Sequence, residues 1–278
     1  MNDPVISVIM GTYNPDISKL KSAVDSIIKQ TEKSWEMIIY DDGSTEAVSE
    51  NIREICAYDD RLIYCKGETN KGLAHCLNEA FKLSKGRFIA RMDDDDESLA
   101  KRFEIEREFL ENNPEYGWVG CIADLFDNTG VWGRAQRAEK PEASDFLPSS
   151  PFIHPSVMFR REVLEECNGY REDKLTARCE DYELFMRLYS LGKKGFNIQT
   201  VLFKYREDSK KLKRSMKYCA NEMKIRRQGF KKLGIYNLKN GFYVVKPILV
   251  GLISKFPVLA QKIRTGTEKG DHIVKSEQ

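Results

Sequence analysis

Short apolar runs alternate with helix-period segments through the first 100 residues, and each run ends in polar residues. The run at 5–10 precedes a segment, 17–28, in which apolar residues recur every three or four positions. Similar apolar runs follow at 37–40, 61–65 and 87–90. Strands that alternate with helices build a mostly parallel sheet with helices on both faces. The pattern therefore predicts an α/β fold.

Three of these predicted strands end in clusters of polar side chains. The clusters are residues 12–14 (TYN), Asp41 with Asp42, and residues 93–96 (DDDD). In open α/β sheets, ligands bind outside the carboxyl ends of the strands. Because the three clusters would meet at that edge, the sequence predicts a ligand site there.

The four consecutive aspartates at 93–96 indicate what kind of ligand to expect. Adjacent carboxylates repel one another unless a cation or solvent relieves the charge. Mg²⁺ and Mn²⁺ take carboxylate oxygens and keep coordination positions open for phosphate. A solvated acidic turn explains the run alone equally well. The position of the run directly after an apolar strand, opposite Asp41, favours a metal site.

The pattern of alternating elements continues less regularly beyond residue 98. Helices are predicted at 99–112 and 180–191, and strands at 116–122 and 156–159. Residues 128–151 are rich in Gly, Pro, Ser and charge and lack periodicity, so they predict a long loop over the site.

Charge is distributed unevenly along the chain. Residues 1–203 hold 26 basic and 37 acidic side chains, a net charge of −11, whereas residues 204–264 hold 17 and 3, a net charge of +14. Aromatic and aliphatic residues interleave with the basic ones, which favours helices lying on an anionic membrane surface. The alternative is a solvated basic bundle that packs on the acidic part. Nucleic-acid binding is not expected, because no recognised motif is present.

The cysteines and the apolar segments suggest where the protein works. Seven scattered cysteines without a CxxC pair argue against disulfides and zinc and favour reduced cytosolic thiols. No signal peptide precedes the first predicted strand. The best candidate for a membrane span, 241–260, is interrupted by two lysines and two prolines. We therefore expect a cytoplasmic protein, peripheral at the inner face of the cell membrane.

Six segments occur in an order and spacing that a known family shares. They are SVIMGTYNP (7–15), IIYDDGSTE (38–46), NKGLAHCLNEAF (70–81), IARMDDDDES (89–98), HPSVMFRREVL (154–164) and CEDYELFMRL (179–188). In these segments the chain resembles family-two glycosyltransferases of the GT-A fold, roughly across residues 4–205. The resemblance implies a Rossmann-like sheet with helices on both faces, and the charge pattern predicts a basic C-terminal helical region after it.

The resemblance and the charge pattern together imply a division of the chain. Residues 1–205 would form the catalytic domain, with a nucleotide-sugar half at about 1–97 and an acceptor half at about 98–205. Residues 206–278 would form the basic amphipathic helical region, with possible attachment to a membrane surface.

Donor-side roles are carried over from the family's motifs. Thr12, Tyr13 and Asp41 match the region that holds the nucleotide base, and Lys71 lies where it could approach the diphosphate. The family's DxD motif binds the ribose and the metal–diphosphate.

The register of the DxD motif best pairs Asp93 with Asp95. Asp95 is then the main metal ligand, Asp93 a ribose-side residue and second metal ligand, and Asp94 the variable position on the nucleotide-sugar side. The shifted register, Asp94 with Asp96, stays open. The metal would be Mn²⁺ or Mg²⁺.

Acceptor-side roles come from the last two motifs. Asp181 matches the general base of a Glu-Asp pair, with Glu180 and His154 on the acceptor side. An inverting transfer needs a carboxylate that takes the proton of the acceptor hydroxyl. The alternative is that Glu180 and Asp181 only cap the helix and complement its dipole.

The sequence therefore predicts an inverting, metal-dependent hexosyl- or N-acetylhexosaminyltransferase. It would move sugar from a UDP-sugar to a saccharide or lipid-linked acceptor in surface polysaccharide synthesis. One alternative is a nucleotidyltransferase, which would more typically show a glycine-rich phosphate loop with a nearby lysine, and none is clear. Another is a non-catalytic peripheral membrane scaffold. The sequence makes no prediction of the oligomeric state.

Overall fold

The computed structural model describes residues 3–207, 215–254 and 273–274. The strands are β1 (Ile6–Thr12), β2 (Trp35–Asp41), β3 (Leu62–Lys66), β4 (Phe88–Arg91), β5 (Glu97–Ser98), β6 (Trp118–Asp127), β7 (Gly130–Ala135), β8 (Met158–Arg160), β9 (Gly195–Arg206) and β10 (Ile273–Val274). The α-helices are α1 (Ile17–Ile28), α2 (Glu46–Cys56), α3 (Leu73–Leu83), α4 (Arg102–Asn112), α5 (Arg161–Glu166), α6 (Glu180–Ser190), α7 (Met216–Lys232) and α8 (Gly241–Ile253). Two short 3₁₀ helices are η1 (Ala143–Phe146) and η2 (His154–Ser156).

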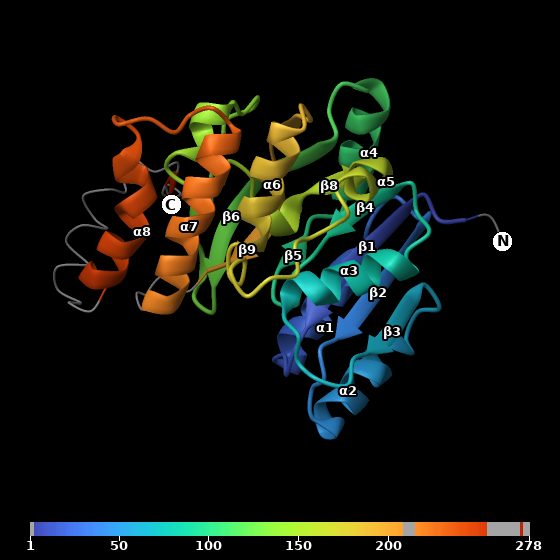
Figure 1. Ribbon diagram of the computed structural model, residues 1–278. Helices are drawn as coiled ribbons and strands as arrows, with labels where there is room; N and C mark the ends of the chain where they lie inside the picture. Colours follow the sequence, from blue (N-terminus) through green and yellow to red (C-terminus); the bar gives the residue numbers. More distant parts are fainter. Residues whose placement is uncertain (1–2, 208–214, 255–272, 275–278) are drawn as a thin grey trace.

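The strands within the described residues form one sheet, in the order β10-β7-β6-β8-β4-β1-β2-β3 (Figure 1). β9 pairs with β6, and β5 pairs with β9. The N-terminal half, β3-β2-β1-β4, is parallel throughout, as expected. β8 is then antiparallel to both β4 and β6, while β6 and β9 are parallel.

Side chains of β1 alternate between two apolar cores, because successive residues of a strand point to opposite faces of the sheet. Val8 and Met10 lie in one core with residues of α1, α2 and α4. Ile9 lies in the other core with residues of α3, α5 and α6. Helices therefore cover both faces, and the predicted α/β class is confirmed.

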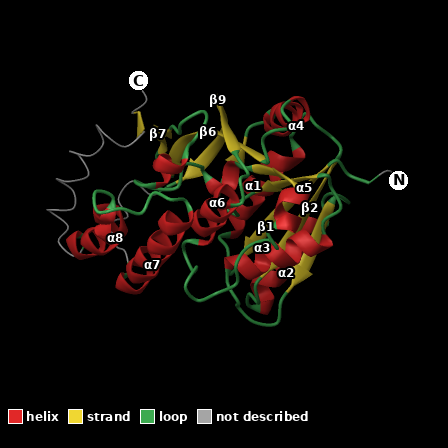
Figure 2. Cartoon of the chain, turned by 45° about the horizontal axis from the view of Figure 1, so that its top comes forward, coloured by secondary structure: helices red, strands yellow, loops and turns green. Residues whose placement is uncertain are grey.

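Helices α7 and α8 pack beside α6, where the three lie in a row (Figure 2). Ile225 and Phe230 of α7 and Val244 of α8 belong to the same buried core as α6. A side-chain carbon on Gly229 would lie 2.2 Å from the sulfur of Met186, so a larger residue on α7 would require the Met186 side chain of α6 to move. Within the described residues, the basic region is thus in part a packed layer of the molecule.

The rest of the basic region, 208–214 and 255–272, lies outside the described residues. No helix in the described ranges has both the length and the apolar character needed to cross a membrane.

Candidate active site

The carboxyl end of β2 presents two buried aspartates. Asp41 accepts hydrogen bonds from the Ser44 amide (2.8 Å), the Ser49 hydroxyl (2.6 Å) and the Tyr64 hydroxyl (2.9 Å). Burial acts to raise the pKa of Asp41, but the hydrogen bonds from Ser44, Ser49 and Tyr64 outweigh it and lower the pKa. Asp41 is therefore a fixed anion at the base of the site.

Asp42 shapes the loop that precedes α3. Its two carboxylate oxygens accept the backbone N–H groups of Lys71 (2.9 Å) and Gly72 (2.7 Å). Gly72 has a φ of 96°, a conformation that glycine adopts readily and other residues rarely do. The side chain of Lys71 is exposed on this loop.

The turn after β1 lies against the turn after β2. The Asn14 amide donates to the Ser44 hydroxyl (2.7 Å), and the Thr45 amide donates to Asn14 Oδ1 (3.1 Å). Thr12 is buried and donates its hydroxyl to Asp94, which joins this turn to the acidic cluster after β4. The Tyr13 ring is 51% exposed, so it is not a core residue and can contact a ligand from this edge.

The four aspartates after β4 have different surroundings. Asp93 forms an ion pair with Arg91, and Asp94 accepts the Thr12 hydroxyl. Asp96 is fully buried and accepts the backbone N–H of Arg206 (2.7 Å), so it is directed toward β9. The Asp95 carboxylate accepts no hydrogen bond from the residues that the structure describes, and it is partly exposed.

Burial and mutual repulsion raise the pKa values of three of these carboxyl groups. The pKa of Asp94 rises to about 6, because burial and then the charge of Asp93 outweigh the bond from Thr12. Burial, followed by the charge of Asp93, also raises the pKa of Asp95, and that of Asp96 rises well above its ordinary value.

The chemistry of this cluster fits a divalent cation that uses few protein ligands. Among the described residues, no three acidic, histidine or cysteine side chains converge into a complete metal cage. One oxygen of Asp96, Oδ2, is buried without a hydrogen-bond partner in the described structure. A cation beside Asp93 and Asp95 would relieve the crowded negative charge and keep positions open for phosphate and water.

Asp181 lies in the first turn of α6, after the N-cap residue Cys179. The side chain of Cys179 forms no cap hydrogen bond, and the first turn carries the acidic residues Glu180, Asp181 and Glu183, as the alternative role at the helix dipole also predicts. Burial raises the pKa of Asp181 to about 6, and the charge of Glu180 adds to the rise. Backbone N–H groups and the charge of Arg91 act in the opposite direction. Asp181 is therefore a carboxyl group that gains or loses its proton near neutral pH.

His154 begins η2 and is buried beside a tyrosine that the sequence analysis did not single out. His154 Nε2 lies 2.8 Å from the Tyr170 hydroxyl. Burial, followed by the charge of Arg91, lowers the pKa of His154 well below its ordinary value, so the imidazole is neutral. Sequence reasoning offered no signal for Tyr170, which lies in an irregular segment between two matching motifs.

Arg91, the last residue of β4, was also missed. Its side chain is 2% exposed and pairs with Asp93. Its Nε and Nη1 groups are buried without a hydrogen-bond partner in the described part of the chain. The charge of Arg91 also acts on Asp181 and Tyr170. The charge of Arg91 therefore acts on both the acidic cluster and the acceptor-side residues.

The structure places polar groups after β1 and β2, an acidic cluster after β4, and a carboxyl group of raised pKa at the start of α6. The family model of glycosyl transferase family 2 matches residues 7–167. The chain belongs to glycosyl transferase family 2.

Two relatives illustrate the family. The chain is 36% identical over 248 residues to the putative glycosyltransferase EpsE of Bacillus subtilis, covering 88% of each chain. It is 24% identical over 257 residues to the Escherichia coli UDP-Glc:alpha-D-GlcNAc-diphosphoundecaprenol beta-1,3-glucosyltransferase WfgD, covering 91% of this chain and 95% of that one. The chain is therefore a glycosyltransferase with relatives in bacterial polysaccharide synthesis.

Solved structures of glycosyltransferases share the fold. Staphylococcus aureus TarS, residues 1–349, in complex with UDP-GlcNAc, has a TM-score of 0.65 at 17% identity, covering 95% of this chain and 74% of that one. The mannosyltransferase PcManGT of Pyrobaculum calidifontis, in complex with GDP-Man and Mn²⁺, has a TM-score of 0.61 at 17% identity, covering 97% and 76%.

Proposed function

We propose that this glycosyltransferase transfers a hexosyl or N-acetylhexosaminyl group from a UDP-sugar to an acceptor hydroxyl, with inversion at the anomeric carbon. The observation that carries the proposal is the buried Arg91 side chain, which pairs with Asp93 and whose charge also acts on Asp181. The acidic cluster at 93–96 suits a metal-bound diphosphate, and Asp181 suits a proton acceptor. Residues 1–205 would supply the whole catalytic domain.

On the donor side, we assign the binding of the nucleotide base to Thr12, Tyr13 and Asp41. Tyr13 would contribute an exposed ring and Asp41 a fixed negative charge. The Lys71 side chain would approach the diphosphate from the loop that Asp42 holds. The names of the TarS and PcManGT structures support a nucleotide-sugar donor, with UDP in the first and Mn²⁺ in the second.

For the metal, we assign Asp95 as the main ligand of Mn²⁺ or Mg²⁺. Asp93 would be the second ligand and would face the ribose. Asp94 would remain near the nucleotide-sugar through its bond to Thr12. The inward direction of Asp96 supports this register over the one that pairs Asp94 with Asp96. A bound divalent cation would offset the negative charge that develops on the departing diphosphate.

The acceptor half assigns the proton transfer to Asp181. As the acceptor oxygen forms its bond to the anomeric carbon, its proton passes to the Asp181 carboxylate, and the bond to the UDP oxygen breaks on the opposite face. His154, neutral and held in place, and Glu180 would line the acceptor side.

Metal-dependent binding of UDP tests the donor site directly. We expect Asp95→Ala to lose most of the Mn²⁺-dependent affinity for UDP, because the cation bridges the diphosphate to the carboxylates. Isothermal titration of UDP with and without Mn²⁺ measures this. The control is Asp60→Ala, which removes an exposed acidic side chain in the turn before β3. An unchanged titration of Asp95→Ala would place the metal elsewhere.

We assign a saccharide or a lipid-linked sugar as the acceptor. The enzyme would reach this acceptor at the anionic inner face of the cell membrane. The name of WfgD gives a diphosphoundecaprenol-linked sugar as the substrate of that enzyme, which supports a lipid-linked acceptor here. The described part of the basic region, 215–254, holds eight basic side chains and one acidic side chain, Glu222, which pairs with Arg226.

Helix α8 carries an apolar stripe on its outer face. We use "the α8 stripe" for the exposed residues Phe242, Val245, Leu249 and Leu252, which recur every three or four positions. The opposite face of α8 packs on α7 through Val244 and Gly251. The net positive charge of the described basic region disfavours contact between two copies of it. An anionic bilayer complements both features.

Vesicle binding tests the α8 stripe. We expect the double variant Phe242→Glu/Leu249→Glu to bind vesicles of phosphatidylglycerol and phosphatidylcholine at least about tenfold more weakly, because each large apolar side chain gains about 1.5–3 kcal/mol on burial. Leu191→Glu, at another exposed leucine, should bind normally. Added salt should weaken binding of the native chain, since exposed charges are screened. Equal binding to neutral vesicles would refute the electrostatic contribution.

A further inference from the structure

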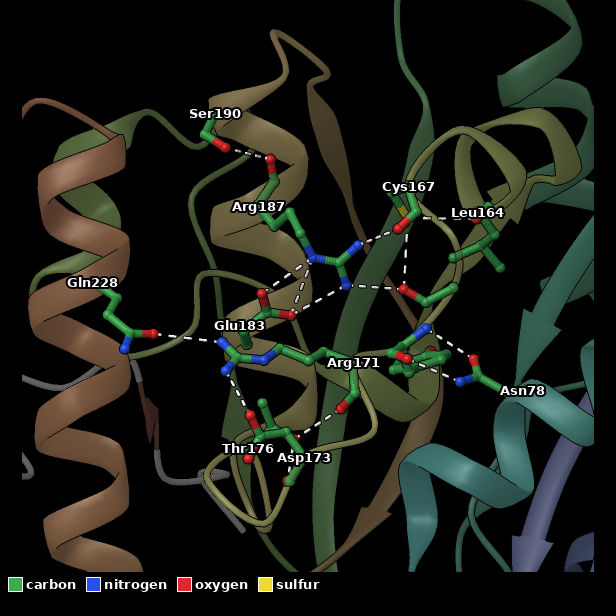
Figure 3. Close-up of polar contacts among 12 residues, drawn as sticks. Asn78, Leu164, Cys167, Arg171, Asp173, Thr176, Glu183, Arg187, Ser190 and Gln228 are labelled. Atoms are coloured by element: carbon green, nitrogen blue, oxygen red, sulfur yellow. Dashed lines mark hydrogen bonds and ion pairs between the residues drawn. The ribbon is translucent and has the colours of Figure 1, made fainter.

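The segment 167–172 connects α5 toward α6 and is fixed from two sides (Figure 3). From α6, Arg187 donates to the carbonyl oxygens of Cys167 and Gly169, the latter at 2.8 Å. From α3, the side-chain amide of Asn78 accepts the Tyr170 N–H (2.8 Å) and donates to the Tyr170 carbonyl oxygen (2.8 Å). Asn78 therefore pairs with the Tyr170 backbone at both of its polar groups.

The segment packs closely against Asn78 at Gly169. Gly169 has a φ of 64°, and a side-chain carbon there would lie 2.5 Å from Asn78 Oδ1. Asn78 Nδ2 also donates to Glu172 Oε1 (2.7 Å), and His75 lies 2.9 Å from the other oxygen of Glu172. Helix α3, which begins at the Asp42-bound loop, thus holds the segment along one side.

The Tyr170 side chain carries this fixed position into the site. Its ring is 3% exposed, and its hydroxyl lies 2.8 Å from His154 Nε2, with the two rings edge to face at 5.5 Å. Burial raises the pKa of Tyr170, so both partners stay neutral. The charges of Arg91 and Asp181 both act on this hydroxyl. Tyr170 therefore contacts His154 and lies within electrostatic range of both Arg91 and Asp181.

We propose that Tyr170 is a positioning residue of the transfer site, held by Asn78 and in turn fixing His154 and the segment that leads to Asp181. The inference rests on the proposed transferase function. Tyr170 is buried and its hydroxyl contacts His154, so it would act through the placement of His154 and Asp181. Placement errors of about 1 Å can cost on the order of 10²-fold in rate.

Removal of one hydroxyl tests the proposal. We expect Tyr170→Phe to lower kcat by roughly 10- to 100-fold, with the KM for the nucleotide-sugar unchanged, because the donor contacts lie elsewhere. The matched control is Tyr189→Phe on α6, which removes a hydroxyl that donates to the Pro141 carbonyl oxygen (2.8 Å). A purely structural role would lower the melting temperature of both variants and leave both kcat values normal.

A second readout needs no substrate. Amide hydrogen exchange over residues 168–181 should quicken in Tyr170→Phe and in Asn78→Ala, and remain normal in Tyr189→Phe. Asn78→Ala should also lower kcat, and its effect should not add to that of Tyr170→Phe, because both act through one hydrogen-bonded path. The control for Asn78 is Asn112→Ala, which removes an exposed amide that donates to the Glu108 carbonyl oxygen of its own helix.

The outcomes separate this inference from the proposed function. If the native chain transfers no sugar from any nucleotide-sugar, the proposed function is wrong, and the exchange experiment still decides whether Asn78 and Tyr170 hold the segment. If the native chain is active and Tyr170→Phe keeps a normal kcat, the positioning role is refuted. Additive losses in the Asn78→Ala/Tyr170→Phe double variant would also refute the single path.

Discussion

Asp181→Asn is expected to retain UDP binding and lose sugar transfer by about 10²–10⁴-fold, the usual contribution of a general base. Asparagine preserves the size of the side chain and cannot take the proton of the acceptor hydroxyl. The donor groups after β1, β2 and β4 are untouched, so titration of UDP with Mn²⁺ should match that of the native chain. Near-normal turnover on the native acceptor would show that the proton goes elsewhere.

The same residue should set the acid limb of the pH profile. Burial and Glu180 raise the pKa of Asp181 to about 6, so the carboxyl is protonated below that pH and cannot act as a base. We expect kcat/KM to rise with pH through about 6 and then level off. Glu180→Gln removes a neighbouring negative charge, which should lower the pKa of Asp181 and move the rising limb to lower pH. If the rising limb has the same midpoint in Glu180→Gln as in the native chain, the limb belongs to another group.

The sequence predicted the parallel half of the fold because its signals are local. The apolar run around Val8 and Ile9 ends where β1 ends, and the helix at 17–28 coincides with α1. Each of these elements buries residues at a regular period, which a single sequence displays directly. The two polar turns that follow β1 and β2 then meet, since parallel neighbours end at the same edge.

The other half was less predictable because its pairing is non-local. Residues 128–151 were predicted as one loop, but 130–135 form β7, which pairs in a hairpin with β6. β9 was missed because its residues 199–200 are exposed polar residues, and its pairing with β6 shifts register. Such strands are stabilised by partners distant in sequence and lack a clear alternation of their own.

The candidate site divided in the same way. Acidic side chains after strands could be found from the sequence, because charge next to an apolar run is conspicuous. Arg91 and Tyr170 could not be found, because each matters through contacts that only the fold creates: an ion pair with Asp93 and a hydrogen bond to His154. The packing of α7 on α6 was likewise left open by a charge pattern that suits either a membrane surface or a protein surface.

Arg102→Met is expected to lower the free energy of unfolding by about 3–5 kcal/mol, the usual cost of leaving one charge of a buried pair without its partner. Arg102 and Glu106 have no exposed surface, and Arg102 Nε lies 3.0 Å from a Glu106 oxygen. Arg102 also donates to the carbonyl oxygens of Arg91 and Val157, each at 3.2 Å. Urea unfolding with an unchanged slope would measure the loss. Lys82→Met, at an exposed pair with Glu79, should change stability by no more than about 1 kcal/mol.

The double variant Arg102→Met/Glu106→Leu separates the two contributions of Arg102. Replacing both members of a buried pair by apolar residues is often neutral or stabilising, so the double variant should regain stability relative to Arg102→Met. The carbonyl oxygen of Arg91 would still lack the Arg102 donor, and Arg91 precedes the acidic residues 93–96 by one position, Met92. We therefore expect the double variant to fold and to bind UDP with Mn²⁺ more weakly than the native chain. Native-like binding would show that Arg102 serves stability alone, whereas weakened binding would show that a buried arginine on α4 holds the end of β4 in the position that the metal site requires.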